Sequence, residues 1–446
     1  MNIVYKVIHN KKMELQPLYG QSYQDIKKYI NENLGIREKE KDKYAEVFTP
    51  TILIEDVLDN LPRNVWSNTE LKWLDPCAGS GNFFLVVYHR LLNNITSIKD
   101  KQELHKHIVT KMLFMVELNT ENTKKLQLLF GKEANIYNED FLSWKNQEQY
   151  DIILGNPPYQ STKKVTYTGS AGNKTLWDKF LVKSLQILKQ KGYLGFITPS
   201  NWRRPEHELY DLMTKENHLI YLHIYNKNKG KELFRVQTRF DVYIIQKTVP
   251  TKISIIVDEN NEKYQDLNIS EWPFLPNFEY NSIKQILVKP TEKGINVLFD
   301  SSFYDARKLH KEKSLNYKYP VIHTVNKTGF GLLYTNDNSK HFHTKKVILN
   351  FNEKLYPIND YLGKYGMSQL NFGIPIKSKQ EGEQIIKSLT SPKFESIIRA
   401  TKWSSFQTDY RMFKYFKPLF YQDSIFINKK TIKNTKNNSN KTRKQY

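Results

Sequence analysis

The sequence Trp73-Leu74-Asp75-Pro76-Cys77-Ala78-Gly79-Ser80-Gly81-Asn82 leads from a short apolar strand into an apolar helix over Leu85 to Leu92. Its two glycines allow the backbone to turn tightly and to approach a ligand closely, as a nucleotide-binding fold requires between its first strand and helix. The loop lacks the third glycine of a dinucleotide fingerprint and the Lys-Ser/Thr pair of a phosphate-binding loop. It therefore favours a nucleoside without phosphates, such as an adenosyl cofactor, with a plain turn as the alternative.

Short apolar segments bounded by Gly, Pro and Asn alternate with helical patterns on both sides of this loop. Such alternation is typical of a parallel sheet that is covered by helices on both faces. The sequence thus predicts a doubly wound, Rossmann-like α/β layer that extends to about Pro250. The expected strands are Leu71–Leu74, Leu113–Val116, Tyr150–Leu154, Tyr193–Ile197 and Phe240–Ile245.

Carboxylates follow the predicted strands in succession. Glu117 ends the second strand, where a carboxylate can accept both ribose hydroxyls of a nucleoside. Asp140 comes one step later beside Phe141, so that the acid can accept from an adenine amino group while the ring packs on the base. Each acid alone is typical of a solvated strand end. Together with Asp75, however, they form a series after a glycine loop, which indicates a binding site.

A buried strand ends in an amide, two prolines and an aromatic in Asp151-Ile152-Ile153-Leu154-Gly155-Asn156-Pro157-Pro158-Tyr159. Two prolines fix the loop and leave carbonyl acceptors without N–H donors. An exocyclic amine on a base is a poor nucleophile because its lone pair is delocalised into the ring. If the Asn156 side-chain oxygen and the Pro157 carbonyl accept its hydrogens, the lone pair is freed to attack an electrophilic methyl group, while Tyr159 stacks on the base. The alternative is a rigid loop that merely ends a strand.

Together these segments resemble the S-adenosylmethionine-dependent DNA adenine amino-methyltransferases, specifically the gamma class typified by the TaqI methyltransferase. The resemblance covers residues 44 to 250 and includes Tyr44-Ala45-Glu46-Val47-Phe48-Thr49-Pro50, an element that touches the methionine part of the cofactor in that class. Gly192–Pro199 matches a later strand. The resemblance implies a class I methyltransferase fold, S-adenosyl-L-methionine as cofactor, duplex DNA as substrate and extrusion of the target adenine. It also implies a restriction-modification system, with a cognate restriction endonuclease acting on the same site.

The resemblance assigns roles to individual residues. Asn156, Pro157, Pro158 and Tyr159 match the catalytic motif, and Phe234 matches an aromatic that sandwiches the flipped adenine with Tyr159. A core position is nevertheless the ordinary interpretation of Phe234. Asp75 departs from the pattern, because a close relative carries Glu there. The cofactor-binding residues that the resemblance implies, with the ring beside Asp140 included, are Thr49, Asp75, Ala78, Gly79, Gly81, Glu117, Asp140 and Phe141.

Composition narrows the class of protein. The chain has 446 residues, enough for two or three domains, and its 39% hydrophobic content is too high for a disordered chain. The 68 basic and 46 acidic residues give a net charge of +22, which favours a nucleic acid partner, with A+T-rich codon usage as the alternative. A single cysteine excludes a disulfide framework and predicts a reducing, cytoplasmic location. The sequence also predicts a soluble protein without a signal peptide or a membrane partner.

Four segments are expected along the chain. Aromatic and basic residues alternate in two parts of the third segment, Ala400–Gln407 and Tyr410–Lys417, where packing in a core is favoured over contact with DNA. Sequence recognition is assigned to that segment because the α/β layer alone offers no surface that reads several base pairs. The segments are an N-terminal helical extension (1–43), a methyltransferase catalytic domain (44–250), a mixed α+β target-recognition domain (251–427) and a basic disordered tail (428–446).

Several residues of the second domain and some histidines have weaker signals. Gln369, Asn371 and the lysines at 377 and 379 are candidates for reading base edges, although no pattern assigns them. Two His-x-His pairs, at 105/107 and 341/343, have ligand-like spacing but no accompanying cluster of acids or thiolates, so that no metal is expected.

Other functions remain open at this point. The Asn-Pro-Pro-Tyr motif also suits methylation of RNA or of a protein glutamine, and a DNA-binding relative without catalysis is a third alternative. The large basic second domain and the Phe-Thr-Pro element favour DNA, and the intact motif favours catalysis. Cys77 is expected to pack rather than to react, because cytosine ring methylation uses a cysteine in the catalytic loop, where this chain has Asn156. The sequence leaves open the recognised DNA site, a cellular or viral origin and the oligomeric state.

Overall fold

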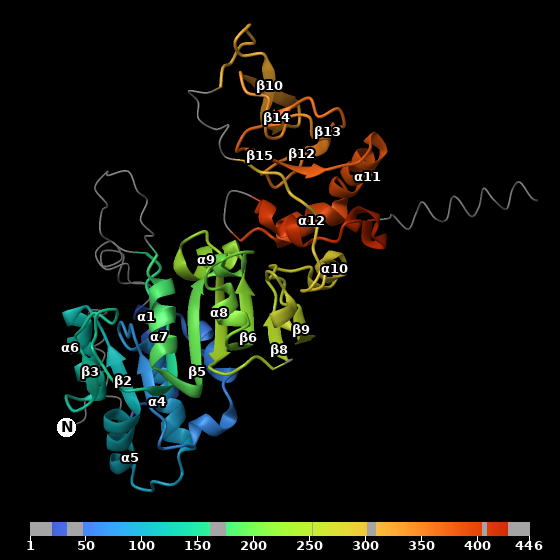
Figure 1. Ribbon diagram of the computed structural model, residues 1–446. Helices are drawn as coiled ribbons and strands as arrows, with labels where there is room; N and C mark the ends of the chain where they lie inside the picture. Colours follow the sequence, from blue (N-terminus) through green and yellow to red (C-terminus); the bar gives the residue numbers. More distant parts are fainter. Residues whose placement is uncertain are drawn as a thin grey trace, which may run out of the picture. The chain divides into compact units, whose positions relative to one another are not determined.

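The computed structural model describes residues 20–33, 48–160, 175–251, 253–300, 309–403 and 408–426 (Figure 1). The predictions for Tyr44–Val47, for Ser404–Gln407 and for the basic tail from 428 to 446 lie outside these residues. The chain divides into two compact units. The first comprises Met1–Trp202 and Asp211–Ser270, and the second comprises Arg203–Tyr210 and Glu271–Tyr446.

The first unit is built on a nine-stranded sheet with the strand order β3-β2-β1-β4-β5-β7-β6-β8-β9. Strands β3, β2, β1, β4 and β5 are parallel, whereas β7 runs antiparallel to both of its neighbours. This arrangement confirms the predicted doubly wound α/β fold. The strands are β1 (Trp73–Asp75), β2 (Leu113–Val116), β3 (Asn135–Tyr137), β4 (Tyr150–Gly155), β5 (Leu188–Pro199), β6 (His218–Tyr225), β7 (Phe240–Gln246), β8 (Ser254–Val257) and β9 (Lys263–Leu267).

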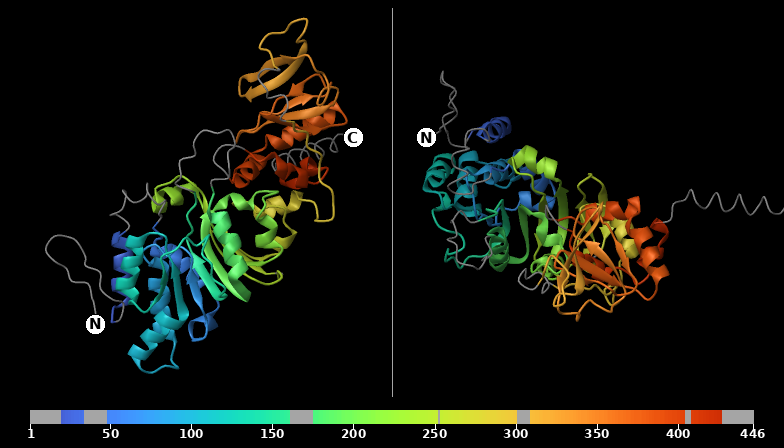
Figure 2. Two further views of the ribbon diagram at one scale, coloured as in Figure 1. Left: turned by 60° about the vertical axis from the view of Figure 1, so that its left-hand side comes forward. Right: turned by 90° about the horizontal axis from the view of Figure 1, so that it is seen from above.

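Helices cover both faces of this sheet (Figure 2). The apolar side chains of α1, α3 and α4 share one buried core with β4, β5 and β7, and α7 packs against β5 from the opposite face. None of the described helices is long and apolar enough to cross a membrane. The helices are α1 (Tyr23–Asn33), α3 (Thr51–Asp59), α4 (Asn82–Asn94), α5 (Lys101–His107), α6 (Thr120–Phe130), α7 (Trp177–Ile187), α8 (Tyr210–Thr214) and α9 (Lys227–Phe234), with short turns η1 (Arg63–Trp66), η2 (Ile108–Met112) and η3 (Ser200–Arg203).

Strand β4 has an almost continuous apolar sequence because both of its faces are buried. Ile152 and Leu154 point into the core under α3 and α4, and Ile153 points the other way. In the register of the sheet, Ile153 lies opposite Leu74 of β1. The carboxyl ends of the two strands therefore meet, which brings the glycine loop after β1 beside the Asn-Pro-Pro-Tyr segment after β4, at the edge where doubly wound sheets bind ligands.

The first unit continues beyond Pro250, where the sequence analysis placed a domain boundary. Strand β8 pairs in parallel with β6, and β9 pairs with β8, so both extend the same sheet. The compact unit accordingly ends at Ser270. The assignment of a separate role to each segment stays a prediction.

The second unit contains two three-stranded sheets, with the orders β11-β10-β14 and β13-β12-β15. Its helices and strands agree with the expected mixed α+β character. They are α10 (Tyr280–Ile286), β10 (Tyr319–Asn326), β11 (Gly329–Thr335), β12 (Lys346–Asn350), β13 (Ile358–Asp360), β14 (Gly366–Met367), β15 (Asn371–Pro375), α11 (Lys379–Leu389) and α12 (Pro392–Ala400), with turns η4 (Ile269–Glu271), η6 (Tyr410–Tyr415), η7 (Phe420–Gln422) and η8 (Ser424–Phe426).

Aromatic residues of Tyr410–Lys417, where aromatic and basic residues alternate in the sequence, pack in the core of the second unit. Phe413 and Phe416 are fully buried and contact each other and Phe394 of α12. The core interpretation of Tyr410–Lys417 is therefore correct. Asn371 is also buried, and its side-chain amide donates to the carbonyls of Ile322 and His323. It holds two strands together, so its interpretation as a base-reading residue is wrong.

Candidate functional site

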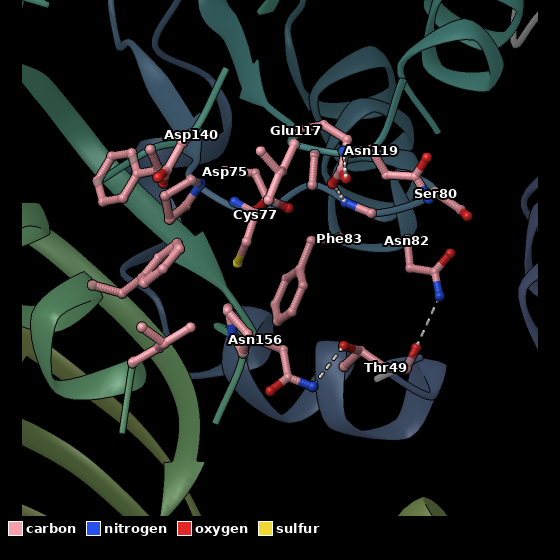
Figure 3. Close-up of a pocket in the computed structure, with 18 of the residues that line it drawn as sticks. Thr49, Asp75, Cys77, Ser80, Asn82, Phe83, Glu117, Asn119, Asp140 and Asn156 are labelled. Atoms are coloured by element: carbon pink, nitrogen blue, oxygen red, sulfur yellow. Dashed lines mark hydrogen bonds between the residues drawn. The ribbon is translucent and has the colours of Figure 1, made fainter. Parts of the chain in front are cut away.

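A cavity of about 380 Å³ opens at the carboxyl ends of β1, β2 and β4. Figure 3 shows Glu117 and Asp140 on one side of it and Thr49 and Asn156 on the other. The cavity collects most of the residues that the sequence singled out, and other residues that it did not. The lining comprises Phe48, Thr49, Asp75, Pro76, Cys77, Ala78, Gly79, Ser80, Asn82, Phe83, Glu117, Leu118, Asn119, Glu139, Asp140, Phe141, Leu142, Asn156, Pro158, Gln160, Leu176 and Phe180.

The glycine loop forms the floor of the cavity. Gly79 and Gly81 have φ angles of 55° and 87°, in the region that favours glycine. A Cβ on Gly81 would lie 2.8 Å from Leu126 Cδ2 on α6. A side chain at this position would therefore be disfavoured by the positive φ angle and would also clash with α6. Gly81 does not line the cavity itself. Its contribution is to let α4 begin directly behind the loop.

The Glu117 carboxylate is held by the backbone on both sides of the cavity floor. Its Oε2 accepts from the N–H of Gly79 at 2.7 Å, and its Oε1 accepts from the N–H of Asn119 at 2.7 Å (Figure 3). Glu117 is 8% exposed. Two charge-assisted hydrogen bonds thus fix the orientation of the carboxylate and join the loop after β1 to the end of β2.

Asp75 and Cys77 lie deeper and are more enclosed. Asp75 is 2% exposed, and its Oδ1 accepts from the N–H of Cys77 at 3.0 Å. Burial raises the pKa of Asp75 to about 7, an effect that the Cys77 N–H partly offsets and the negative charge of Glu117 reinforces. Burial also raises the pKa of the Cys77 thiol, which disfavours the thiolate. This environment agrees with a packing role for Cys77.

The raised pKa of Asp75 predicts a measurable dependence of stability on pH. A folded state with a pKa of about 7 binds a proton more tightly than an unfolded state with the ordinary value of 3.8. The free energy of unfolding that this group contributes therefore falls as the pH rises between these two values, and it is constant above them. Asp75→Asn removes this contribution. In denaturant unfolding at several pH values, the stability of wild type relative to the variant should rise as the pH is lowered from about 7 to about 5. A constant difference would contradict the assigned pKa.

Asp140 and Phe141 lie in the turn after β3. The Asp140 Oδ1 accepts from the N–H of Leu142, and its backbone carbonyl accepts from the N–H groups of Ser143 and Trp144. The Phe141 ring is 2% exposed and packs against Phe180 of α7, with ring centroids 5.2 Å apart. An exposed carboxylate and an adjacent buried ring therefore face the same end of the cavity.

Asn156 lies at the opposite end, where its orientation is fixed by Thr49. The Nδ2 of Asn156 donates to Thr49 Oγ1 at 3.1 Å (Figure 3). Its Oδ1 is buried and has no hydrogen-bond partner among the described residues. Since one end of the amide is bound to Thr49, the other end presents an acceptor at the cavity wall. Thr49 also lines the cavity, and its expected contact with a cofactor stays a prediction.

The remaining motif residues lie around this position. Pro158 lines the cavity, but Pro157 and Tyr159 do not. The Tyr159 hydroxyl is buried without a hydrogen-bond partner in the described part of the chain, and burial raises its pKa well above the ordinary value. Phe234 is 5% exposed and packs edge-on against Phe240, at 4.9 Å between ring centroids. The structure thus places Phe234 in the hydrophobic core, and its role as a stacking residue stays a prediction.

Sequence reasoning missed several residues of the cavity. Asn82 donates through Nδ2 to the Thr49 carbonyl, and its Oδ1 is buried with no partner in the described residues. Asn119 caps helix α6 by accepting from the N–H of Glu121, a signal that the sequence Asn-Thr-Glu carries. Phe83 and Phe180 lie on helices whose apolar pattern is equally consistent with a core position. Nothing local in the sequence distinguishes them as cavity residues.

His105 and His341, one from each histidine pair, have other surroundings. Among the described residues there is no group of three or more His, Cys, Asp or Glu side chains that could hold a metal ion. His105 instead shares a hydrogen bond of 2.8 Å with the Tyr88 hydroxyl. His341 is 7% exposed, and burial lowers its pKa.

A protein-family comparison identifies the domain that carries this cavity. Residues 80–231 match the family described as Eco57I restriction-modification methylase. The chain contains an Eco57I-type restriction-modification methylase domain. The matched residues include Ser80 and Gly81 of the glycine loop, the acids Glu117 and Asp140, and the whole Asn-Pro-Pro-Tyr segment.

Two curated relatives and one solved structure are also similar to this chain. The chain is 27% identical over 278 residues to an uncharacterized adenine-specific methylase of Mycoplasma pneumoniae, which covers 44% of this chain and 62% of the relative. It is 28% identical over 172 residues to the type II methyltransferase M.VspI of a Vibrio species, which covers 36% of this chain and 39% of the relative. The matches thus span less than two thirds of these relatives. A structure of the Type IIL restriction-modification enzyme MmeI in complex with DNA aligns with a TM-score of 0.49 at 12% identity, over 88% of this chain and 69% of that one.

The cavity has the size and chemistry for S-adenosyl-L-methionine, the cofactor that the sequence resemblance implies. Its volume of about 380 Å³ lies within the usual range for small-molecule sites. Glu117 and Asp140 offer acceptors for hydroxyl and amino groups beside the apolar face of Phe141. At the other side, the buried Oδ1 atoms of Asn82 and Asn156 have no partner among the described residues, a costly arrangement that a ligand donor would relieve.

Proposed function

We propose that the protein transfers a methyl group from S-adenosyl-L-methionine to the exocyclic N6 amine of adenine in duplex DNA, as the modification enzyme of a restriction-modification system. The observation that carries this proposal is the Asn156 side chain. Its Oδ1 is an acceptor at the cavity wall without a partner among the described residues, and it belongs to an Asn-Pro-Pro-Tyr segment that directly follows a buried strand. The naming of the relatives as adenine-specific methylase and type II methyltransferase supports the same substrate.

The cofactor would be held by the residues of the cavity floor and its far end. Glu117, fixed by two backbone N–H groups, would accept from the ribose hydroxyls, and Asp140 from the adenine amino group while Phe141 packs on the ring. The buried Oδ1 of Asn82 would accept from a donor of the methionine part. When bound, S-adenosyl-L-methionine supplies an electrophilic methyl carbon.

The chain's own residues would make the amine a nucleophile. The Asn156 Oδ1 and the Pro157 carbonyl would each accept one amine hydrogen, which shifts the nitrogen lone pair out of the ring and toward the methyl group. Tyr159 would stack on the base. A base inside the duplex cannot reach these groups, so the target adenine would have to leave the helix.

Thr49 would position the catalytic acceptor. Its Oγ1 accepts from the Asn156 Nδ2, so that removing the hydroxyl leaves the amide free to rotate. Thr49→Val is expected to lower kcat for methyl transfer by about tenfold or more, the loss that one hydrogen bond to a reacting group typically causes. Thr49→Ser keeps the hydroxyl and should restore most of the activity in the same assay. Equal activity of Thr49→Val and wild type would exclude this role.

The second unit would supply sequence recognition, and the chain's net charge of +22 would favour binding to DNA. A cognate restriction endonuclease would cut the same site when it is unmethylated. A methyltransferase that acts on DNA would work inside the cell.

The test is incubation of the purified protein with isotopically labelled S-adenosyl-L-methionine and, in separate reactions, duplex DNA of mixed sequence, RNA and a protein extract. We expect label in DNA alone. Label in RNA or protein would keep the proposed chemistry of Asn156 but overturn the proposed substrate. Tight binding of the cofactor without transfer to any polymer would instead favour a DNA-binding relative that has lost catalysis.

A further inference from the structure

Lys183, a partly buried residue of α7, binds the turn that carries Asp140 and Phe141. Its Nζ donates to the backbone carbonyls of Phe141, Leu142 and Trp144, at 2.5, 3.2 and 2.8 Å. An ammonium group has three N–H donors, and here each of them has an acceptor within the same turn. Lys183 lies 41 residues after Leu142 in the chain, so the contact joins two separate elements around the cavity.

The same ammonium group lies over the Phe141 ring, with Nζ 5.0 Å from the ring centroid. Phe141 therefore has a cation on one side and the Phe180 ring as a second neighbour. A cation within about 6 Å of an aromatic centroid attracts the ring electrostatically. Lys183 thus fixes both the backbone of the turn and the ring that lines the cavity.

One face of helix α7 carries both a residue that lines the cavity and a residue that binds the turn beside it. Phe180 lines the cavity, and Lys183, one turn further along, binds the turn opposite it. Residues three apart lie on the same face of a helix, so both side chains reach the Asp140 turn together. The Asp140 carbonyl accepts hydrogen bonds from N–H groups within the turn. Among the hydrogen bonds described, the Leu142 and Trp144 carbonyls have no donor besides Lys183, and the Phe141 carbonyl has one other, the N–H of Trp144 at 3.3 Å.

We propose that Lys183 is the positioning residue of the adenine end of the cofactor site: it holds the 140–144 turn so that the Asp140 carboxylate and the Phe141 ring are presented to the cofactor's base. This inference rests on the proposed function, because it requires the cavity to bind an adenosyl group. Lys183 acts through the turn and does not line the cavity. Loss of its ammonium would remove the donor that the Leu142 and Trp144 carbonyls have in the described structure, and the stronger of the two donors to Phe141 O, and would loosen the turn.

The test compares Lys183→Met with Lys179→Met. Methionine keeps the length of the aliphatic chain and removes all three donors, and Lys179 is an exposed lysine one turn earlier on the same helix. Binding of S-adenosyl-L-homocysteine to each variant is measured by titration calorimetry. We expect Lys183→Met to weaken binding by about tenfold or more, the size of one or two lost hydrogen bonds, and Lys179→Met to bind like wild type. In methyl transfer, KM for S-adenosyl-L-methionine should rise by the same factor, with kcat at saturation little changed.

A second ligand separates positioning from a general loss of folding. S-inosyl-L-homocysteine carries an oxygen in place of the adenine amino group, so it lacks the donor that Asp140 would bind. Wild type should bind it more weakly than S-adenosyl-L-homocysteine, whereas Lys183→Met should discriminate less between the two. Unchanged discrimination in Lys183→Met, or an unchanged affinity for S-adenosyl-L-homocysteine, would overturn the inference. If the wild-type protein binds neither ligand, the proposed function itself fails, and the inference about Lys183 fails with it.

Discussion

Asn156→Ala is expected to reduce methyl transfer by at least about 10²- to 10³-fold while cofactor binding persists, a loss comparable to the removal of one donor from an oxyanion hole. The variant removes the buried Oδ1 acceptor at the cavity wall, so the amine keeps its lone pair in the ring. Glu117, Asp140 and Phe141 remain in place, because none of their described contacts involves Asn156. Single-turnover transfer of labelled methyl groups to DNA, together with a binding titration of S-adenosyl-L-homocysteine, measures both quantities.

Asn156→Asp is the informative companion of this variant. The carboxylate keeps an acceptor at the cavity wall, and the Thr49 hydroxyl can reverse its role and donate to it. Asn156→Asp should therefore retain more activity than Asn156→Ala. If Asn156→Ala turns over like wild type, the acceptor mechanism is wrong. If it loses cofactor binding to the same extent as activity, Asn156 serves the cofactor site and not the amine.

The largest expected loss of stability comes from Lys346 in the second unit. Its Nζ donates to Asp360 Oδ2 at 2.7 Å and to the His341 carbonyl at 2.8 Å, and the ion pair is almost completely buried, with side-chain exposures of 0% and 1%. Lys346→Met leaves the Asp360 carboxylate buried without its counter-charge, which typically costs about 3–5 kcal/mol. Denaturant unfolding should show this loss for the second unit.

Lys345→Met is the matched control, because Lys345 is the exposed neighbour of Lys346 in the chain. It should change the free energy of unfolding by less than about 0.5 kcal/mol. Binding of S-adenosyl-L-homocysteine should survive in Lys346→Met, since the cavity belongs to the first unit. Wild-type stability of Lys346→Met would show that the ion pair contributes little to this fold.

The sequence predicts the central strands of the sheet well because burial on both faces leaves a visible apolar run. Strand β4 is such a case, and β2 is matched at both ends. Strand β3 is only three residues long and half-exposed, so it has no apolar run to detect. Strand β8 after Pro250 is a mostly apolar run of only four residues, and β9 is polar and contains a lysine. Only the pairing of β8 with β6, and of β9 with β8, makes them part of the sheet.

The residues of the candidate site that could be predicted are those that directly follow a recognisable strand in the sequence. The glycine loop, Glu117, Asp140 and Asn156 belong to this class, because the parallel sheet brings strand ends together. The contact between Thr49 and Asn156 joins residues 107 positions apart, and that between Lys183 and Phe141 joins residues 42 apart. No local pattern encodes either contact. For Phe234 the sequence offers a motif match but no way to separate two roles. The match cannot distinguish a residue that stacks on a base from a core residue that packs on Phe240.

The most direct test of the central claim is the identity of the methylated atom in DNA. Bacteria that lack their own DNA methyltransferases would express either the wild-type chain or Asn156→Ala, and their genomic DNA would be digested and analysed by nucleoside mass spectrometry and methylation-sensitive sequencing. We predict N6-methyladenine within one recurring sequence for the wild-type chain and none for Asn156→Ala. Methyl groups on cytosine, or N6-methyladenine that persists in Asn156→Ala, would contradict the account.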